Sequence, residues 1–237
     1  MNKKIIIGVI IFIVVALGTG GYFLANSNKS NVPKEPEEQV NVGNENTQVN
    51  TDSKKSLVVY FSVPETDDPN NMTTEEENSA IVVDGEVLGN TQYVAMLISE
   101  NTGADIYRIE PKTPYTTDHE TLVSIAKDEQ NNDTRPEIKS KISNFDDYDI
   151  IYIGYPIWWS DMPKILYTFM ELYDFSGKTV IPFSTHGGSE LAGTVNTIRN
   201  KLSSATVEEN AFTMSRDTME DAPKAVESWL KEIDILE

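Results

Sequence analysis

The chain has 237 residues, a formal net charge of −19 at pH 7, no cysteine and two histidines. The missing cysteines exclude disulfides, thiolate metal sites and a cysteine nucleophile, and two histidines are too few for a histidine-rich metal centre. So large an acidic excess argues against DNA or RNA as a partner, because phosphate binding needs basic patches, and it favours basic protein partners.

The N-terminus carries the strongest hydrophobic pattern. Residues 5–25 contain no charged side chain, and a membrane span needs about 20 mostly apolar residues. Lys3 and Lys4 precede this segment, which predicts a cytoplasmic N-terminus and an extracytoplasmic remainder. A cleaved signal peptide followed by secretion is the alternative, but a clear A-x-A cleavage pattern is missing. We therefore predict a single-pass cell-membrane anchor, a transmembrane helix within residues 1–25.

The next segment differs sharply in composition. Residues 26–55 are polar, rich in Asn, Glu, Gln and Ser, and contain no aromatic residue. A segment of this kind cannot bury enough apolar surface to fold, so we predict a disordered tether. The globular domain is predicted to span residues 56–237.

Within this domain, short apolar runs alternate with segments of helical periodicity. The apolar runs predict strands at residues 57–61, 105–110, 149–154, 178–184 and, more weakly, 206–214. Helical spacing, with Gly or Pro at some of the ends, predicts helices at residues 91–103, 119–130, 163–173, 190–202 and 222–233. Trp229, on the last helix, is expected in the core.

This alternation predicts an α/β fold. A doubly wound, five-stranded parallel sheet of order 2-1-3-4-5 would be covered by helices on both faces. In such sheets ligands bind outside the carboxyl ends of the strands, at the switch point between the first and third strands. The loops after strands one, three and four are therefore the candidates for function.

Each of these three loops has an unusual sequence. "GNT" (89–91) opens a helix and predicts an anion site at its N-terminus, or else a simple cap by Asn90. "YPIWWSDMP" (155–163) places two of the three tryptophans on one loop, which indicates a flat apolar partner or a cap over the core. "STHGGSELAG" (184–193) has adjacent glycines that allow the backbone to approach a flat ring.

The last of these loops also raises the possibility of a hydrolase. Ser184, His186 and Ser189 are nucleophile or base types around an HGG sequence. The nucleophile motif G-x-S-x-G is absent, because Leu191 stands at its final glycine position. No loop supplies a set of Ser, His and acid, so this interpretation is not favoured.

Taken together, the loops resemble a known family. "LVVYFS…GNTQYVA", "IYIGYPIWWSDMP" and "DFSGKTVIPFSTHGGS" occur in this order, and over residues 57–233 the chain resembles the flavodoxin-like family, whose members bind FMN. The resemblance implies phosphate contacts by Ser62, Gly89, Asn90, Thr91 and Gln92. It implies that Pro156, Ile157, Trp158 and Trp159 wall the isoalloxazine, with Trp158 as the nearer ring. It implies that Ser184, Thr185, His186, Gly187 and Gly188 line the other side. No catalytic side chain and no metal are expected.

The chain departs from the family pattern after Ser62. The family's phosphate loop runs S-x-T-G-N-T without a break, whereas residues 63–88 separate its halves here, with eight acidic and no basic residues. "IVVDGEVL" in this insert predicts a hairpin with a two-residue turn. The insert resembles that of a subgroup of flavodoxin-like proteins from Gram-positive bacteria, which implies that FMN binding is kept. Whether Ser62 still reaches the phosphate is left open.

The leading interpretation is a membrane-tethered, FMN-binding electron-transfer protein. Stacked aromatics and surrounding acidic charge would lower the potential of the flavin, and the acidic insert would steer a basic redox partner protein. Two alternatives stay open. One is an NAD(P)H-dependent quinone or flavin reductase of the same fold, which would need a basic site if NADPH is used. The other is a surface interaction module without flavin.

Overall fold

The computed structural model describes residues 54–237. The predicted anchor and nearly all of the predicted tether lie outside this range. Within the described residues, no helix combines the length and the apolar character that a membrane span requires.

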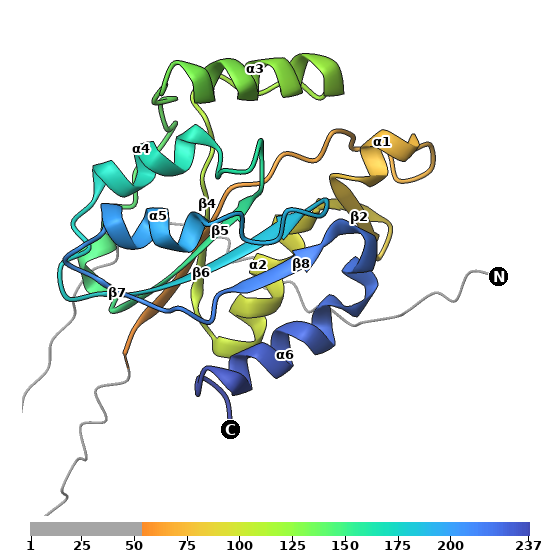
Figure 1. Cartoon of the computed structure of the whole chain (residues 1–237). Coiled ribbons are helices and arrows are strands. Elements are labelled where there is room, and N and C mark those ends of the chain that lie inside the picture. The colour runs from red at the N-terminus through yellow and green to blue at the C-terminus, as the bar shows by residue number, and fades with distance from the viewer. Residues whose placement is uncertain (1–53) are drawn as a thin grey trace, which may run out of the picture. The chain divides into compact units, whose positions relative to one another are not determined.

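A parallel sheet forms the centre of the domain (Figure 1). β1 lies between β4 and β5, β6 pairs with β5, and both β7 and β8 pair with the far side of β6. The bounds are β1 Ser56–Tyr60, β4 Asp105–Arg108, β5 Ile150–Pro156, β6 Thr179–His186, β7 Thr206–Val207 and β8 Phe212–Ser215. The order is therefore the predicted 2-1-3-4-5, with the fifth strand in two pieces.

The break in the fifth strand has a local cause. The backbone N–H of Asn210 donates to the Glu208 carboxylate at 2.8 Å, and the Trp229 indole donates to the Asn210 carbonyl at 2.7 Å. These bonds satisfy the backbone away from β6, so the predicted continuous strand over 206–214 is wrong in its middle. Trp229 is 5 % exposed, which confirms its predicted place in the core.

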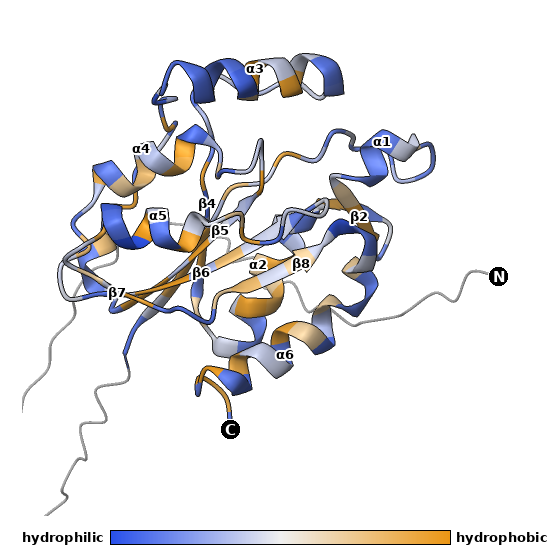
Figure 2. Cartoon of the chain, in the orientation of Figure 1, coloured by the Kyte–Doolittle hydropathy of each residue, from blue (hydrophilic) through white to orange (hydrophobic). Residues whose placement is uncertain are grey.

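Helices cover both faces of the sheet (Figure 1). α2 (Asn90–Thr102) and α6 (Ala222–Glu232) lie on one face, and α4 (Lys164–Leu172) and α5 (Thr194–Lys201) lie on the other. The apolar residues gather on the strands and on the helix sides turned toward them (Figure 2). Side chains of β1 alternate between the two cores: Val58 belongs to the core under α2 and Val59 to the core under α4.

Two helix boundaries show how backbone geometry decides where a helix begins or ends. α2 ends at Thr102, and the next residue, Gly103, adopts a left-handed conformation with φ of 69° that stops the helix. α5 begins at Thr194 rather than at 190, because Glu190, Ala192 and Gly193 all have positive φ. The first turn of the predicted helix over 190–202 is therefore wrong.

Most of the remaining elements lie at the carboxyl edge of the sheet. The insert forms α1 (Thr74–Glu77) and the antiparallel pair β2 (Ala80–Val83) and β3 (Glu86–Gly89). Asp84 and Gly85 have φ of 52° and 88°, which confirms the predicted two-residue turn. α3 (His119–Asn131) lies apart from the other helices in Figure 1, where α4 is its nearest neighbour. Two short 3₁₀ helices, η1 (Phe145–Asp147) and η2 (Arg216–Asp221), complete the domain.

Candidate functional site

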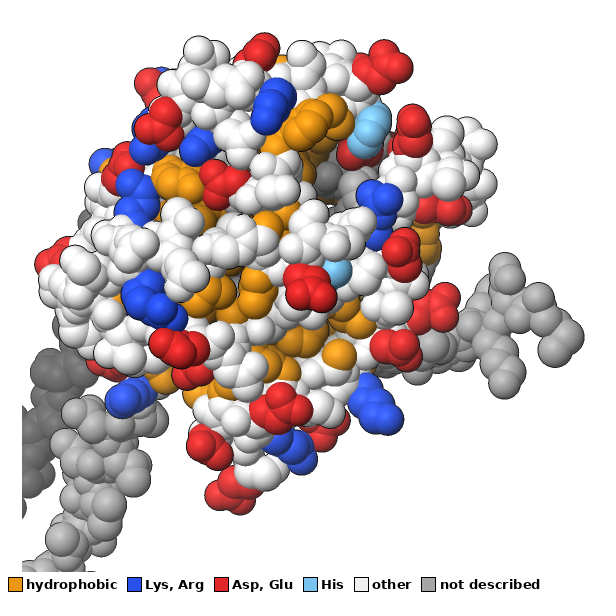
Figure 3. Space-filling view, viewed as in Figure 1, with side chains coloured by type: hydrophobic (Ala, Val, Ile, Leu, Met, Phe, Trp, Pro, Cys, Tyr) orange, Lys and Arg blue, Asp and Glu red, His pale blue; other side chains and the backbone are white. Residues whose placement is uncertain are grey.

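A cavity of about 300 Å³ opens at the carboxyl ends of β1, β5 and β6. This is the switch point at which doubly wound sheets bind ligands. The space-filling view shows a hollow here, between the part of the surface formed by α3 and the part formed by α1, with hydrophobic side chains at its rim (Figure 3).

The structure brings most of the predicted site residues together. Ten of them line the cavity: Ser62, Asn90, Thr91, Pro156, Ile157, Trp158, Trp159, Thr185, His186 and Gly187. The other four, Gly89, Gln92, Ser184 and Gly188, lie outside its lining. Each of these four residues contacts a residue of the site or of the adjoining strands.

The insert does not separate the two halves of the loop in space. Ser62 lies so close to Gly89 that a Cβ at position 89 would be 2.1 Å from the Ser62 Oγ. Only glycine permits this approach, so Gly89 lets Ser62 reach the start of α2. The Arg108 guanidinium fixes the other side of Ser62 by donating to its carbonyl at 3.0 Å.

The start of α2 supplies hydrogen-bonding groups to the cavity. The Gln92 side chain accepts from the Gly89 amide at 3.4 Å, and the Ser79 carbonyl of the insert accepts from the Asn90 amide at 3.0 Å. The amides of Thr91 and Gln92 belong to the first turn, where a helix offers no partner. An anion here would meet free amides and the positive end of the helix dipole.

Asn90 adds a further unpaired group. Its side-chain amide donates to the Asn78 carbonyl at 3.0 Å, but its Oδ1 is buried and has no hydrogen-bond partner. A buried polar atom without a partner is costly and rare in a native protein. Since Asn90 lines the cavity, a hydroxyl group of a ligand could supply the missing donor.

Hydroxyl groups join the start of α2 to the end of β6. The hydroxyls of Thr91 and Thr185 lie 2.7 Å apart, and both side chains are buried. Ser184 points to the opposite side of β6, where its hydroxyl is 2.8 Å from that of Thr213. Ser184 therefore holds the sheet edge together behind the cavity.

The two tryptophans lie on a tight turn. Trp158 and Asp161 exchange both backbone hydrogen bonds, at 2.8 and 3.0 Å. Trp159 and Ser160 occupy the two central positions with φ of 51° and 58°, a left-handed conformation that is strained for residues other than glycine. Strain of this kind persists only where the surroundings enforce it.

The two tryptophan side chains have different environments. The Trp158 ring packs edge-to-face against Phe61 and Tyr115, with centroids 5.5 and 5.7 Å away. The Trp159 ring is 48 % exposed, and its indole donates to the Val123 carbonyl of α3 at 3.1 Å. Trp158 is therefore anchored to the core, whereas Trp159 stands at the mouth of the cavity.

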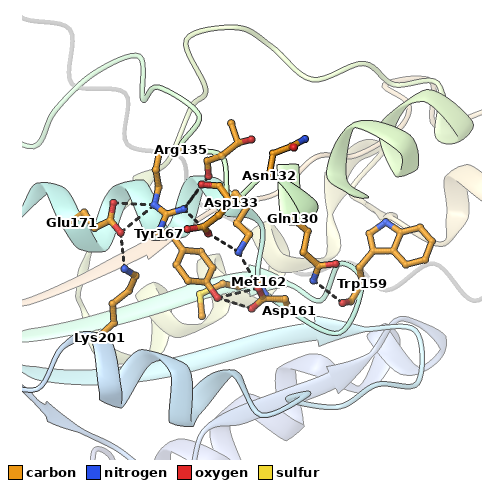
Figure 4. Close-up of polar contacts among 12 residues, drawn as sticks. Gln130, Asn132, Asp133, Arg135, Trp159, Asp161, Met162, Tyr167, Glu171 and Lys201 are labelled. Atoms are coloured by element: carbon orange, nitrogen blue, oxygen red, sulfur yellow. Dashed lines mark hydrogen bonds and ion pairs between the residues drawn. The ribbon is translucent and has the colours of Figure 1, made fainter. Parts of the chain in front are cut away.

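A polar network holds this turn in place (Figure 4). The Tyr167 hydroxyl donates to both oxygens of Asp161, at 2.9 and 3.0 Å. Arg135, between α3 and α4, binds Asp133 and Glu171, and Lys201 of α5 reaches Glu171 from the other side. Hydrogen bonds from Arg135 and Lys164 to the Asp133 carboxylate lower the pKa of Asp133 to about 2. The network joins α4, α5 and the end of α3 into one support for the turn.

The loop after β6 presents backbone and a neutral histidine. The His186 Nδ1 accepts from the Gly188 amide at 2.9 Å, so a neutral His186 carries its proton on Nε2. Burial lowers the pKa of His186 below its ordinary value, which keeps the ring uncharged at neutral pH. Gly188 has φ of 120° and provides the turn that aims its amide at His186.

Several lining residues escaped the sequence analysis. Glu65, Asn78 and Ser79 come from the insert, His119, Leu122, Val123 and Ala126 come from α3, and Arg216 comes from η2. Glu65 is buried, and its carboxylate lies 2.9 Å from the His119 Nδ1, which joins the insert to α3 beside the cavity. Only Arg216 carried a usable signal, since it follows the last strand at the same edge of the sheet.

The arrangement has two chemically distinct ends. One end has free amides, hydroxyls and an unpaired amide oxygen at the start of α2, as an anionic, hydroxylated chain requires. The other end is lined by the two tryptophans, Pro156 and Ile157 together with Thr185–Gly187, an apolar and backbone-rich surface of the kind that suits a flat ring. The described residues contain no cluster of His, Asp and Glu that could hold a metal ion.

Comparison with known proteins gives a consistent result. The sequence model of the family described as Flavodoxin matches residues 80–233. A Bacteroides eggerthii protein, provisionally classed as a flavoprotein, is 31 % identical, with a TM-score of 0.58 over 76 % of this chain and 98 % of that chain. A Bacteroides uniformis protein of the same provisional class is 28 % identical, with a TM-score of 0.55 over 73 % of this chain and 98 % of that chain.

A third solved structure, a flavoprotein from Lactobacillus acidophilus in complex with FMN, is 18 % identical, with a TM-score of 0.50 over 73 % of this chain and 99 % of that chain. At this identity the likeness concerns the fold alone. No sequence among the curated proteins matches the chain. The family match spans well over half of the chain, and it agrees with the sheet order and with the position of the cavity. The chain therefore belongs to the flavodoxin family.

Proposed function

We propose that the chain binds FMN in this cavity and serves in electron transfer. The observation that carries the proposal is the pairing of the two ends: a helix start with unpaired polar groups, and a cavity wall formed by the tryptophan turn and the loop after β6. FMN has a phosphate and ribityl hydroxyls at one end and a planar ring at the other. The two Bacteroides relatives, which are provisionally classed as flavoproteins, support this choice, and the Lactobacillus structure shows that this fold can hold FMN.

The residues present fit the cofactor in kind. Ser62, Thr91 and the first-turn amides of α2 would hold the phosphate, and Asn90 Oδ1 would accept from a ribityl hydroxyl. The turn Trp158–Asp161 and residues Thr185–Gly187 would flank the ring. When bound, FMN supplies reversible one- and two-electron chemistry. The protein orients it, excludes water from it and sets the charge around it.

Titration with FMN and with riboflavin tests this proposal. The purified full-length protein should bind one equivalent of FMN, with quenching of flavin and tryptophan emission. Riboflavin lacks the phosphate and should bind at least tenfold more weakly, since charge-assisted hydrogen bonds contribute roughly 1.5–3 kcal/mol. Thr91→Val should narrow this difference. Absence of binding, or equal affinity for both flavins, would contradict the proposal.

A reductase of the same fold is tested with the same preparation. Oxidation of NADH or NADPH in the presence of a quinone should be negligible if the protein is an electron carrier. The cavity lining of the described domain contains a single Lys or Arg, which argues against a dedicated site for a nicotinamide 2′-phosphate. Rapid, saturable oxidation of NADPH would favour the enzyme instead.

We further propose that the domain is tethered outside the cell membrane. The support is the uncharged segment 5–25 behind Lys3 and Lys4, together with the polar stretch 26–55. Protease added to intact cells should release the folded domain through cuts in residues 26–53. Protection in intact cells with cleavage after lysis would contradict this topology.

A further inference from the structure

We propose that Arg216 tunes the redox potential of the site, because it would bind reduced FMN more strongly than oxidised FMN. This inference rests on the proposed function and concerns a residue outside the sequence motifs of the three loops. Its effect is opposite to that expected from the stacked aromatics and the surrounding acidic charge, which would lower the potential.

Arg216 is the only Lys or Arg in the lining of the cavity within residues 54–237. It is the first residue of η2 and follows β8 directly. Since β8 is parallel to β6, its carboxyl end lies at the edge of the sheet where the cavity opens. The topology therefore delivers one guanidinium group to the site in a chain with a net charge of −19.

The guanidinium packs against the backbone of Gly187. A Cβ at position 187 would lie 2.9 Å from the Arg216 Cζ, 3.0 Å from its Nη1 and 3.1 Å from its Nε. The shortest of these distances is below any that a real Cβ shows, so a side chain at position 187 would push the flexible end of Arg216 aside. Gly187 has no positive φ. Glycine at position 187 instead matters because it leaves space for the guanidinium. Gly187 and Arg216 both line the cavity.

The charge of Arg216 is available to a ligand. Its ion-pair partner in the described domain is Asp217, whose Oδ1 lies 3.9 Å from the Arg216 Nε and whose side chain is 76 % exposed. A long, exposed pair of this kind contributes little. Burial keeps His186 neutral, and Glu65 and His119 pair with each other. Arg216 is thus the permanent positive charge in the cavity lining of the described domain, and it is only weakly paired.

A fixed cation distinguishes the two redox states of a flavin. Reduction at neutral pH adds negative charge to the ring system, whereas the phosphate keeps its charge in both states. A guanidinium beside the ring therefore favours the reduced state and raises the potential. A guanidinium that meets only the phosphate would stabilise both states equally.

Affinity and potential, measured together on the full-length protein, test the inference. The dissociation constant of oxidised FMN is measured by fluorescence quenching, and the midpoint potential by equilibration with reference dyes. Arg216→Gln should weaken binding of reduced FMN at least tenfold more than binding of oxidised FMN. This corresponds to a potential lower by about 30 mV for a two-electron couple.

Three further variants test whether the charge and the position of Arg216 set the potential. Arg216→Lys keeps the charge and should restore much of the potential. Gly187→Ala should displace the guanidinium and lower the potential in the same direction as Arg216→Gln. Arg199→Gln is the matched control, because Arg199 pairs with Glu209 on the surface at 3.0 Å and lies outside the cavity lining. It removes the same charge and should leave the potential unchanged.

The outcomes separate this inference from the proposed function. Equal weakening of both redox states in Arg216→Gln would assign the side chain to the phosphate and overturn the inference, as would an unchanged potential. A wild-type protein that binds no FMN would refute the proposed function, and the inference would fall with it.

Discussion

The two sides of the cavity are built differently. The tryptophan turn, Trp158–Asp161, is held by paired backbone bonds, by Tyr167 on α4 and by the packing of Trp158 on Phe61 and Tyr115. The insert, which supplies Glu65 and Ser79, is held beside the cavity by polar contacts: Glu65 with His119, and Asn90 with the Ser79 and Asn78 carbonyls. The side fixed by aromatic packing is called the rigid side below, and the side held by these polar contacts is called the looser side.

The largest effect is expected from the rigid side. Trp158→Ala removes a ring that packs against two other aromatic rings, and we expect a loss of about 2–4 kcal/mol in the free energy of unfolding. Trp159→Ala should cost less than about 1 kcal/mol, because the Trp159 ring is half-exposed. Urea denaturation of both variants measures the difference. Equal losses would mean that the two rings are not divided between core and cavity mouth.

The looser side should govern ligand release. Glu65→Gln keeps the shape of the side chain but removes its charge, and hydrogen bonds to charged groups are worth roughly 1.5–3 kcal/mol. If the weakened contact between Glu65 and His119 lowers the barrier to FMN release by about 1.4 kcal/mol, FMN should dissociate about tenfold faster. Stopped-flow displacement of FMN measures this rate.

Asp67→Asn is the matched control for Glu65→Gln, because Asp67 lies on the same insert, is exposed and is not part of the cavity lining. It should leave the dissociation rate unchanged. If both variants release FMN equally fast, the effect comes from the net charge of the insert and not from the pair of Glu65 with His119.

The outward face of the insert should act only on association with a basic partner. Glu75 and Glu77 are exposed, whereas Glu76 accepts from the Thr73 amide at 2.6 Å and caps α1. Glu75→Gln with Glu77→Gln should slow association with the redox partner about two- to fivefold at low salt, with little effect at high salt. Asp146→Asn with Asp147→Asn, just before the start of β5 at the opposite edge of the sheet, should have no such effect.

The smallest effect is expected from the network that holds the turn. The pKa of Asp133 is lowered to about 2 from an ordinary value near 3.8, so its contribution to stability is present above about pH 4 and is lost as the pH falls through 2. Asp133→Asn should be slightly less stable than wild type at pH 6, and the difference should shrink as the pH falls from 4 to below 2. Thermal melts across this pH range measure the difference. A difference of constant size over the whole range would show that the carboxylate charge is not the cause.

The hydrophobic pattern of neighbouring residues was sufficient to predict the sheet and most of its helices. Apolar runs and helical periodicity are properties of neighbouring residues, and the parallel topology follows from their alternation, so the sheet order and the position of the loops could be predicted. Glycine residues also predicted the turn at Asp84 and Gly85 and the end of α2 next to Gly103.

The rest of the site depends on contacts between distant residues. Glu65 and His119 are separated by 54 positions, and no periodicity in either segment predicts that they meet. Gln92 and Ser184 were predicted as site residues but lie outside the cavity lining. The direction of a side chain at a helix start or a strand end is set by its hydrogen bonds, which the sequence pattern does not show. Arg216 could have been noticed, since the carboxyl end of the fifth strand lies at the same edge as the others.

The most direct test of the account is a crystal structure of the protein grown with FMN. We predict one FMN per chain, with the phosphate at the start of α2 beside Ser62 and Thr91. The ring should lie between the turn Trp158–Asp161 and residues Thr185–Gly187, and Asn90 Oδ1 should accept a hydrogen bond from the ribityl chain. A cavity that stays empty at saturating FMN, or FMN bound elsewhere on the domain, would contradict the account.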